Sequence, residues 1–374
     1  MQGKNCIFHI PNHIDKEGKS GSSVRPLRMI RAFEEQGYNV DVIMGYGKER
    51  KIQIFEIKKN IKKGKKYDFL YSESSTTPTL LTEKNHLPMY PFLDFGFLKF
   101  CKEREIKIGL FYRDIYWKFP IYKEKVHGIK YLMAQLCYRY DLQKYKQLLT
   151  KFYLPTLQMG KYVGEEKLRE KADELPPGAE VNLEKINKKH NYFNDKRVRE
   201  KISIFYVGGV TGHYSISKLL ELVGELNFLE LTVCCPKDAW NEKKSSYEKY
   251  LNERISIVHK YSCELDDYYQ KADLCIAWFE PSEYMEFAVP IKIFEYLGKT
   301  IPIVATSGTV AGDFVERNNI GWAVSYDKKE LKSLLQKIYS NQYLLMEKHE
   351  NCRRVLPGNT WNARAKKVIN DLSR

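Results

Sequence analysis

The sequence predicts a two-domain α/β protein in which each domain is a doubly wound parallel sheet with helices on both faces. Its 374 residues exceed what one hydrophobic core usually holds, since domains commonly run to about 100–200 residues. Hydrophobic residues make up 43% of the chain, which is ample for globular packing. Short apolar runs alternate with helical patterns along both halves, and this alternation is typical of parallel sheets.

The first half opens with an apolar run at residues 6–10, which predicts a buried strand. Pro26 lies in the first turn of the helix that we expect next, and Gly37 ends that helix. A second helix, which carries isoleucines at helical spacing, ends near Gly64. We expect further strands at residues 40–44, 67–71, 106–112 and 152–154, and helices at 91–102 and 128–149.

A proline-rich break, Leu175-Pro176-Pro177-Gly178, ends the first alternation. Residues 184–201 are polar and charged with little periodicity, so we expect them to connect the two domains. An apolar run at residues 202–207 starts the second alternation. Further strands are expected at residues 229–234, 255–258, 274–278, 301–305 and 321–324, and helices at 218–226, 265–271, 291–298 and 329–339.

The charge of the chain indicates anionic partners. It has 62 basic and 47 acidic residues, which give a formal net charge of +15. Nucleic acid, anionic lipid and phosphate-bearing substrates all fit this excess. Lysines are densest at residues 58–66, at the end of the expected amphipathic helix. Either a solvated lysine-rich face or a contact with an anionic membrane surface explains this run.

No stretch approaches the ~18 consecutive apolar residues of a membrane-spanning helix, and the first apolar run is too short for a signal peptide. The eight cysteines form no CxxC pair, and Cys6, Cys137, Cys234 and Cys275 have apolar neighbours. Reduced, buried thiols are the plain interpretation. We therefore expect a cytoplasmic protein, with or without peripheral contact to the inner face of a membrane.

Two glycine-rich loops, Gly18–Ser23 and Gly208–Gly212, follow the first expected strand of each domain and lead into a helix. Backbone N–H groups at a helix N-terminus, approached through small residues, form a ready phosphate site. Neither loop is a P-loop, because the G-x-x-x-x-G-K-[ST] pattern does not occur. A glycine loop that only makes a tight turn is an equally good interpretation.

Metal ligation is not indicated by the sequence. Glu264, Asp266 and Asp267 cluster, but acidic residues are favoured in the first turn of a helix. His9 and His13 are four residues apart, but a strand and a proline separate them from any shared helix face. A serine hydrolase is unsupported because no G-x-S-x-G elbow occurs. We expect no metal and no other cofactor.

The most specific segment spans residues 290–305, Pro-Ile-Lys-Ile-Phe-Glu-Tyr-Leu-Gly-Lys-Thr-Ile-Pro-Ile-Val-Ala. A proline opens a short helix there, and a turn and an apolar strand follow. The segment resembles the nucleotide-sugar-binding segment of GT-B glycosyltransferases, particularly the family 4-like retaining enzymes. Weaker likenesses follow in the same order as in that family, at residues 18–44, 175–180, 204–209 and 360–365.

The resemblance covers nearly the whole chain and implies the GT-B fold, with two Rossmann-like domains facing a central cleft. It implies an acceptor-binding domain at residues 1–183, a linker at 184–201 and a donor-binding domain at 202–357. It also implies a closing helix at residues 358–374 that crosses back onto the first domain.

The resemblance assigns the donor site to the second domain. The helix N-terminus at Pro290 and Ile291 faces the diphosphate, and Lys292 lies near the phosphates or the sugar. Glu295 accepts hydrogen bonds from both ribose hydroxyls. The loop after the first strand of that domain contributes Gly208, Gly209, His213 and Tyr214.

The sequence departs from the family pattern at two places. Many family members carry two glutamates eight residues apart, and the first of them falls on Phe287 here. The family loop usually supplies an arginine and a lysine, where this chain has His213, Tyr214 and Lys218. These departures leave the donor and the stereochemical outcome open.

In the first domain, Arg113 and Asp114 follow an expected strand. Asp114 is expected to orient the acceptor hydroxyl or to act as a base, and Arg113 to contact a phosphate. A structural Arg–Asp pair is the alternative. The other residues expected on the acceptor side are Gly21, Ser22, Ser74, Tyr116 and Trp117; their aromatic rings suit either stacking on a sugar or core packing.

We therefore predict a glycosyltransferase that moves a sugar from a nucleotide-sugar donor to a glycan acceptor, by analogy a lipid-linked bacterial surface polysaccharide intermediate. Family likeness implies retention of configuration, with Arg113, Asp114 and Lys292 as the catalytic residues. The expected partners are donor, acceptor and the inner membrane surface through the basic first domain; nucleic acid is not favoured, and a homo-oligomer is left open. The alternatives are a DNA glucosyltransferase, a catalytically silent GT-B scaffold and a nucleotide-sugar epimerase of the same fold.

Overall fold

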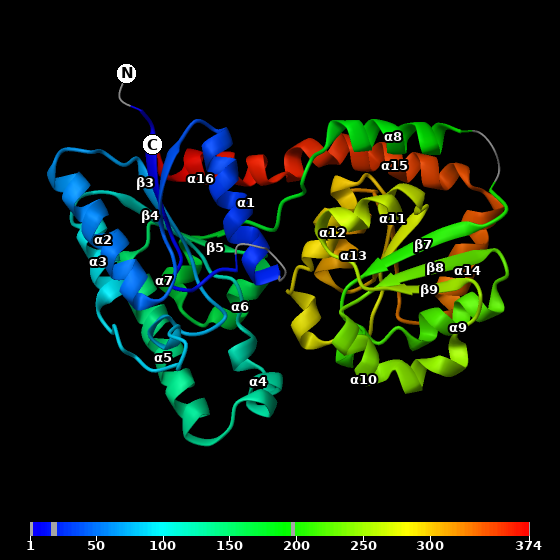
Figure 1. Ribbon diagram of the computed structural model, residues 1–374, viewed down its shortest axis with the longest axis horizontal. Helices are drawn as coiled ribbons and strands as arrows, with labels where there is room; N and C mark the ends of the chain where they lie inside the picture. The colour runs from blue at the N-terminus through cyan, green and yellow to red at the C-terminus, as the bar shows by residue number, and fades with distance from the viewer. Residues whose placement is uncertain (1–2, 16–20, 196–198, 374) are drawn as a thin grey trace. The chain divides into compact units, whose positions relative to one another are not determined.

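The chain folds into two compact units (Figure 1). The computed structural model describes residues 3–15, 21–195 and 199–373. Unit 1 comprises Met1–Pro177 and Trp361–Arg374, and unit 2 comprises Gly178–Thr360. The units therefore divide at residues 177 and 360, whereas the sequence placed the divisions near residues 183–202 and 357. Within the described residues, no helix combines the length and the apolar character that a membrane span needs.

Unit 1 contains one parallel sheet whose strands lie in the order β2-β1-β3-β4-β5-β6. Its inner strands are almost wholly buried, as expected for a parallel sheet with both faces covered. The strands of unit 1 are β1 (Asn5–His9), β2 (Asn39–Ile43), β3 (Phe69–Glu73), β4 (Lys107–Phe111), β5 (Lys151–Leu154) and β6 (Ala172–Glu174).

The helices of unit 1 follow the predicted alternation with one shift at the start. The first helix begins at Gly21, within the stretch expected to be a glycine loop, so Pro26 lies inside the helix rather than in its first turn. Residues 18–20 of that loop lie outside the described residues. The α-helices are α1 (Gly21–Glu35), α2 (Gly47–Lys62), α3 (Leu93–Lys102), α4 (Pro120–Lys125), α5 (Gly128–Leu148), α6 (Gly160–Val163), α7 (Glu166–Arg169) and α16 (Trp361–Leu372), and the 3-10 turns are η1 (Thr79–Leu81), η2 (Tyr116–Lys118) and η3 (Leu157–Met159).

The closing helix α16 belongs to unit 1, as the resemblance implied. It packs on α1, and Trp361, Ala365, Val368 and Leu372 are buried in the same apolar cluster as Phe33 of α1. The last helix of the chain thus completes the core that the first residues begin.

Unit 2 contains a second parallel sheet, in the order β12-β11-β10-β7-β8-β9. Its strands are β7 (Ile202–Val207), β8 (Leu229–Cys234), β9 (Ile255–Val258), β10 (Leu274–Ala277), β11 (Ile303–Thr306) and β12 (Gly321–Val324). Its helices are α8 (Leu183–Asn194), α9 (Ser217–Glu225), α10 (Lys237–Tyr247), α11 (Asp266–Lys271), α12 (Ile291–Gly298), α13 (Val310–Arg317), α14 (Lys328–Ser340) and α15 (Tyr343–Val355), with 3-10 turns η4 (Gly212–Tyr214), η5 (Glu248–Tyr250), η6 (Ser262–Leu265), η7 (Glu283–Glu286) and η8 (Leu356–Asn359).

The stretch expected to connect the two domains, residues 184–201, lies within unit 2, and much of it forms the helix α8. The helix packs on α11 and α15 of unit 2. Its buried face consists of Ile186, Phe193 and Lys189, whose Nζ donates a hydrogen bond to the carbonyl of Gln270 at 2.9 Å. Because a lysine occupies the packing face, the apolar periodicity that reveals other helices is missing from the sequence.

The order of strands reverses at one point in each sheet. In unit 1 the reversal lies between β1 and β3, and in unit 2 it lies between β7 and β10. Open parallel sheets bind ligands outside the carboxyl ends of their strands, at such a switch point. The two switch points are therefore the first places to look for a functional site.

Candidate functional site

The switch point of unit 2 is framed by the loops that follow β7 and β10. Gly208 follows β7 with a φ of 143°, and its N–H donates to the carbonyl of Cys234 at 2.9 Å. Phe279 follows β10 and is held by Thr306, whose hydroxyl accepts from the Phe279 N–H and donates to the Phe279 carbonyl, both at 2.9 Å. Both loops are thus anchored to neighbouring strands.

Lys292, in the first turn of α12, extends its ammonium group into this switch point. Its Nζ atom lies 4.6 Å from the ring centroid of Tyr206, 4.9 Å from that of Phe279 and 5.2 Å from that of Tyr214. A Cβ atom at position 208 would lie 2.5 Å from Nζ, so a larger residue there would displace the ammonium, and the positive φ of Gly208 also favours glycine.

The Lys292 ammonium is buried and has no hydrogen-bond partner among the described residues. Burial lowers the pKa of Lys292 from 10.5 to about 7, although the nearby Glu295 carboxylate favours the charged form. An unpaired buried charge is costly, and the aromatic faces compensate for only part of that cost. Among the described residues, no side chain or backbone group accepts a hydrogen bond from this ammonium, so its charge could be compensated by a bound anion.

The helix that carries Lys292 adds a second attraction for an anion. α12 begins at Ile291, and its N-cap residue, Pro290, makes no side-chain capping hydrogen bond. The first N–H groups of a helix lack intrahelical partners and carry the positive end of its dipole. Glu295, one turn further along α12, is half-buried, so the helix combines a cation, the N–H groups of its first turn and a carboxylate. This combination suits a phosphate ester of a sugar or nucleoside.

The remaining predicted donor residues lie in the loop after β7. The Tyr206 hydroxyl donates to the carbonyl of Gly209, and the half-buried Tyr214 ring meets Phe279 edge-on, with centroids 5.3 Å apart. Lys218 is held elsewhere, because its Nζ donates to the carbonyl of Tyr326 at 3.1 Å. The side chain of His213 lies outside what the structure describes.

In unit 1, the predicted residue Arg113 pairs with Glu73 rather than with its neighbour Asp114. Glu73 ends β3 and is fully buried, and its carboxylate lies 2.9 Å from Arg113 Nη2 and 3.3 Å from Arg25 Nε. The Arg25 guanidinium stacks 3.4 Å from the ring centroid of Phe111. The sequence analysis did not identify Arg25 as a site residue. The available signal was that Arg25 lies four residues before the apolar residue Met29, on the same buried helical face.

Several of the other predicted acceptor-side residues use their side chains in hydrogen bonds to nearby backbone groups. Ser74 is buried, and its Oγ accepts from the Arg113 N–H at 2.9 Å. One Asp114 oxygen accepts from the N–H groups of Ile115 and Tyr116, at 2.6 and 2.9 Å, at the start of η2. The Tyr116 hydroxyl donates to the carbonyl of Thr76 at 3.3 Å. Gly21 and Ser22 open α1, but their side chains are not described.

Trp117 differs from the expectation of a loop aromatic that faces a substrate. Its side chain is 2% exposed, it stacks on Tyr138 with ring centroids 4.7 Å apart, and its Nε1 donates to the Tyr112 hydroxyl at 2.9 Å. Aromatic stacking and the indole hydrogen bond both hold it in the core, which was the alternative interpretation of these loop aromatics.

The switch point of unit 1 is filled by its own side chains. His9 ends β1 and contacts Ser72 of β3 at 2.8 Å and Asp94 of α3 at 2.9 Å. Arg50 of α2 binds both oxygens of Asp94, at 3.0 and 3.1 Å. Burial would raise the pKa of Asp94, but His9 and Arg50 outweigh burial and lower it. Each charge of this network has a partner within unit 1.

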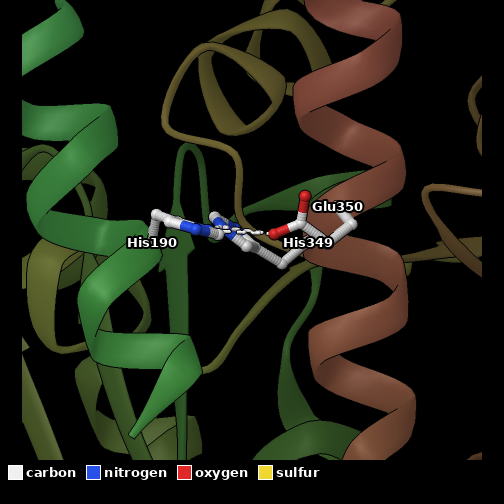
Figure 2. Close-up of side chains that lie close together, drawn as sticks. All are labelled: His190, His349 and Glu350. Atoms are coloured by element: carbon white, nitrogen blue, oxygen red, sulfur yellow. Dashed lines mark hydrogen bonds and ion pairs between the residues drawn. The ribbon is translucent and has the colours of Figure 1, made fainter.

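Figure 2 shows one further cluster of titratable groups, formed by His190 of α8 with His349 and Glu350 of α15. Their ligand atoms lie within 4.8 Å of one another. His349 Nδ1 donates to the Thr300 carbonyl at 2.7 Å, and burial lowers the pKa of His349 to about 4, so its ring is neutral. The Arg353 guanidinium lies 3.3 Å from both Glu350 oxygens and supplies the positive charge there. The cluster is therefore explained as a polar contact in which His190 of α8 lies against the Glu350–Arg353 ion pair of α15.

Comparison with known proteins agrees with the architecture. Residues 273–360, which include Lys292 and Glu295, match the family model described as "Glucosyltransferase 3-like, C-terminal domain". No curated protein matches the chain.

Solved structures of similar fold cover almost the whole chain. HepE from Anabaena, solved in complex with UDP, is 11% identical over 99% of each chain with a TM-score of 0.65. Sucrose-phosphate synthase from Thermosynechococcus elongatus is 14% identical over 98% of each chain with a TM-score of 0.62. WaaG, a glycosyltransferase involved in lipopolysaccharide biosynthesis, is 13% identical over 98% of this chain and 99% of its own, with a TM-score of 0.57. The predicted GT-B fold is confirmed.

Proposed function

We propose that this protein is a glycosyltransferase that takes a sugar from a nucleoside diphosphate sugar bound by unit 2. One observation carries the proposal: the buried Lys292 ammonium has no hydrogen-bond partner among the described residues and lies where an open parallel sheet binds its ligand. A diphosphate would pair that charge and would also accept hydrogen bonds from the N-terminus of α12.

Each part of the unit 2 site has a role in this reaction. Lys292 and the α12 N–H groups stabilise the negative charge that develops on the leaving diphosphate. Glu295 accepts hydrogen bonds from the ribose hydroxyls. Because these groups supply the positive charge, the reaction needs no obligatory metal ion. HepE, which shares this fold, was solved with UDP and with UDP-glucose, which supports UDP as the first nucleotide to test.

Unit 1 binds the acceptor in this proposal. Asp114, which accepts hydrogen bonds from the backbone at the start of η2, orients an acceptor hydroxyl. Arg113, whose N–H donates to Ser74 and which precedes Tyr116 by three residues, contacts a phosphate of the acceptor. With retention of configuration the acceptor attacks from the face of the leaving group, and no protein nucleophile takes part.

We further propose that the acceptor is a lipid-linked polysaccharide intermediate and that the protein works at the inner face of a membrane. The net charge of +15 supports an anionic acceptor or surface.

A thermal-shift screen with UDP, GDP and ADP tests the donor site. A nucleotide at about a hundred times its Kd stabilises a protein by ~2.7 kcal/mol, so true binding raises Tm clearly. We expect UDP to stabilise the wild type and Glu295→Ala to lose that effect. Glu316→Ala, which changes an exposed glutamate of α13 in the same unit, is the matched control and keeps it.

The alternatives give different outcomes in the same experiments. If no nucleotide raises Tm, the chain is a scaffold of this fold rather than an enzyme. Product analysis with donor alone would reveal an epimerase. Salt-dependent binding to duplex DNA, without binding to a glycan, would favour the DNA glucosyltransferase.

A further inference from the structure

Helix α5 presents an apolar stripe to solvent in its first half. Ile129, Leu132, Met133 and Leu136 are 78%, 62%, 38% and 64% exposed. Their spacing of i, i+3, i+4 and i+7 places them on one face of the helix, which Figure 1 shows within unit 1. Contiguous exposed apolar residues of this kind mark a surface that contacts a partner or a membrane.

Positive charge surrounds the stripe. Between residues 118 and 139 the chain has five exposed basic side chains and a single acidic one, Glu124. The basic residues are Lys118, Lys123, Lys125, Lys130 and Arg139. Lys130 and Arg139 belong to α5 itself, so the charges lie beside the apolar side chains and not on a remote face.

A hollow of about 510 Å³ lies along the flank of α5. Arg139 and Tyr131 contribute to its lining together with Lys118, whose Nζ also donates to the carbonyls of Tyr162 and Val163 at 2.8 and 3.0 Å. The one acid in the lining, Glu165, is already engaged by Gln143 at 2.7 Å and Lys146 at 3.1 Å. The hollow is therefore suited to a polar group with negative charge.

We infer that the α5 stripe, Ile129 with Leu132, Met133 and Leu136, docks on a bilayer of anionic phospholipid. The apolar side chains enter the acyl boundary, and the lysines and Arg139 contact phosphate headgroups, one of which the hollow accepts. The inference deepens the proposed function, because it names the surface that brings unit 1 to a lipid-linked acceptor.

The structure favours α5 over the lysine-rich helix that the sequence suggested for this contact. In α2 the isoleucines Ile54 and Ile57 are buried, and the exposed large apolar residues are Ile52 and Phe55, at 60% and 64%. α2 thus offers fewer apolar side chains to a bilayer, although its lysines are dense. Anionic surfaces retain proteins most strongly where both signals coincide.

Co-sedimentation with vesicles tests the inference on the full chain. We expect the wild type to bind vesicles of phosphatidylcholine and phosphatidylglycerol but not vesicles of phosphatidylcholine alone, and to bind less as salt is raised. The triple variant Ile129→Ser, Leu132→Ser, Leu136→Ser should bind at least about tenfold more weakly, since each large apolar side chain contributes substantially to burial in the interface.

The double variant Ile52→Ser, Phe55→Ser on α2 is the matched control and should bind as the wild type does. The inference is overturned if this control loses binding while the α5 variant keeps it, or if the wild type ignores anionic vesicles. It is also overturned if light scattering shows a dimer that the triple variant dissociates, since a second copy then covers the stripe.

The UDP thermal shift of the same variants separates this inference from the proposed function. Vesicle binding without any nucleotide response would refute the function alone, and a UDP response without vesicle binding would refute the docking surface alone. The triple variant should keep the UDP response, which also shows that it is folded.

Discussion

The switch points of the two sheets differ in whether their buried charges are paired. In unit 1, His9, Asp94 and Arg50 fill the reversal between β1 and β3, and every charge has a partner. In unit 2, the reversal between β7 and β10 holds the Lys292 ammonium, which has no hydrogen-bond partner among the described residues. Removing one partner from a paired buried network is strongly destabilising, whereas an unpaired buried charge is a cost that a bound anion removes.

The largest effect is expected where the charges are paired. Asp94→Asn removes the negative charge that binds Arg50 and leaves the buried guanidinium with Glu83, 3.8 Å away, as its nearest counter-charge among the described residues. We expect the free energy of unfolding to fall by about 3–5 kcal/mol, measured by urea denaturation near neutral pH. Glu103→Gln, which breaks an exposed Lys99–Glu103 contact on the same helix α3, should change it by less than about 0.5 kcal/mol. If Asp94→Asn and Glu103→Gln changed the free energy of unfolding equally, the buried network at the unit 1 switch point would contribute no more than an exposed ion pair.

Lys292→Met should change stability in the opposite direction to Asp94→Asn. Methionine fills a similar volume without a charge, so the ligand-free protein should become more stable, because the buried ammonium is no longer unpaired. UDP affinity should fall by about 1.5–3 kcal/mol, the range for a hydrogen bond to a charged group. Calorimetry with UDP and thermal unfolding without it measure the two quantities. A variant that is less stable and binds UDP normally would show that Lys292 is structural.

Gly208→Ala should produce a smaller loss. The φ of 143° disfavours any side chain, and the new Cβ would push on the Lys292 ammonium. We expect a loss of about 1 kcal/mol in stability and weaker UDP binding. At Gly224, on α9, an added Cβ would meet no heavy atom within 4 Å among those described, so Gly224→Ala should be neutral or slightly stabilising. Unfolding curves of Gly208→Ala and Gly224→Ala, recorded side by side, test the predicted difference in stability.

A further expected effect is a pH dependence. Burial lowers the pKa of Lys292 to about 7 from its ordinary value of 10.5. Between about pH 7 and pH 10.5, Lys292 binds a proton in the unfolded chain but not in the folded chain. The free energy of unfolding of the wild type should therefore rise with pH relative to that of Lys292→Met. UDP affinity should fall over the same interval, because the nucleotide pairs with the charged form. Calorimetry across this interval would contradict the assignment if wild type and variant showed the same slope.

The sequence predicted the framework of unit 2 well. Strands at residues 202–207, 229–234, 255–258 and 321–324 and the helix at 291–298 have the expected bounds, because each is an apolar run between glycines, prolines or charged turns. Helix α8 was missed because Lys189 occupies its packing face, and α10 because its sequence is mostly polar. Propensity and periodicity reveal helices only where the buried face is apolar.

The candidate site was predictable only in part. Lys292 was recognised from its own helix, but its aromatic surroundings depend on which strands pair. Tyr206 and Phe279 come together because β7 lies beside β10, and nothing local in either strand reports that pairing. The Glu73 contacts with Arg25 and Arg113 are likewise tertiary, so the expected Arg–Asp alternative at residues 113 and 114 gave way to a partner from another strand.

The return of α16 to unit 1 has a consequence for the order of synthesis. Residues 178–360 form one uninterrupted stretch, and Ala179 bonds to Asn359 where that stretch begins and ends, so unit 2 can fold before translation finishes. The opening residues cannot bury Phe33 and its neighbours completely until Trp361, Ala365, Val368 and Leu372 have left the ribosome. A fragment of residues 178–360 should therefore be the natural one to isolate, while residues 1–177 alone would expose an apolar face and aggregate.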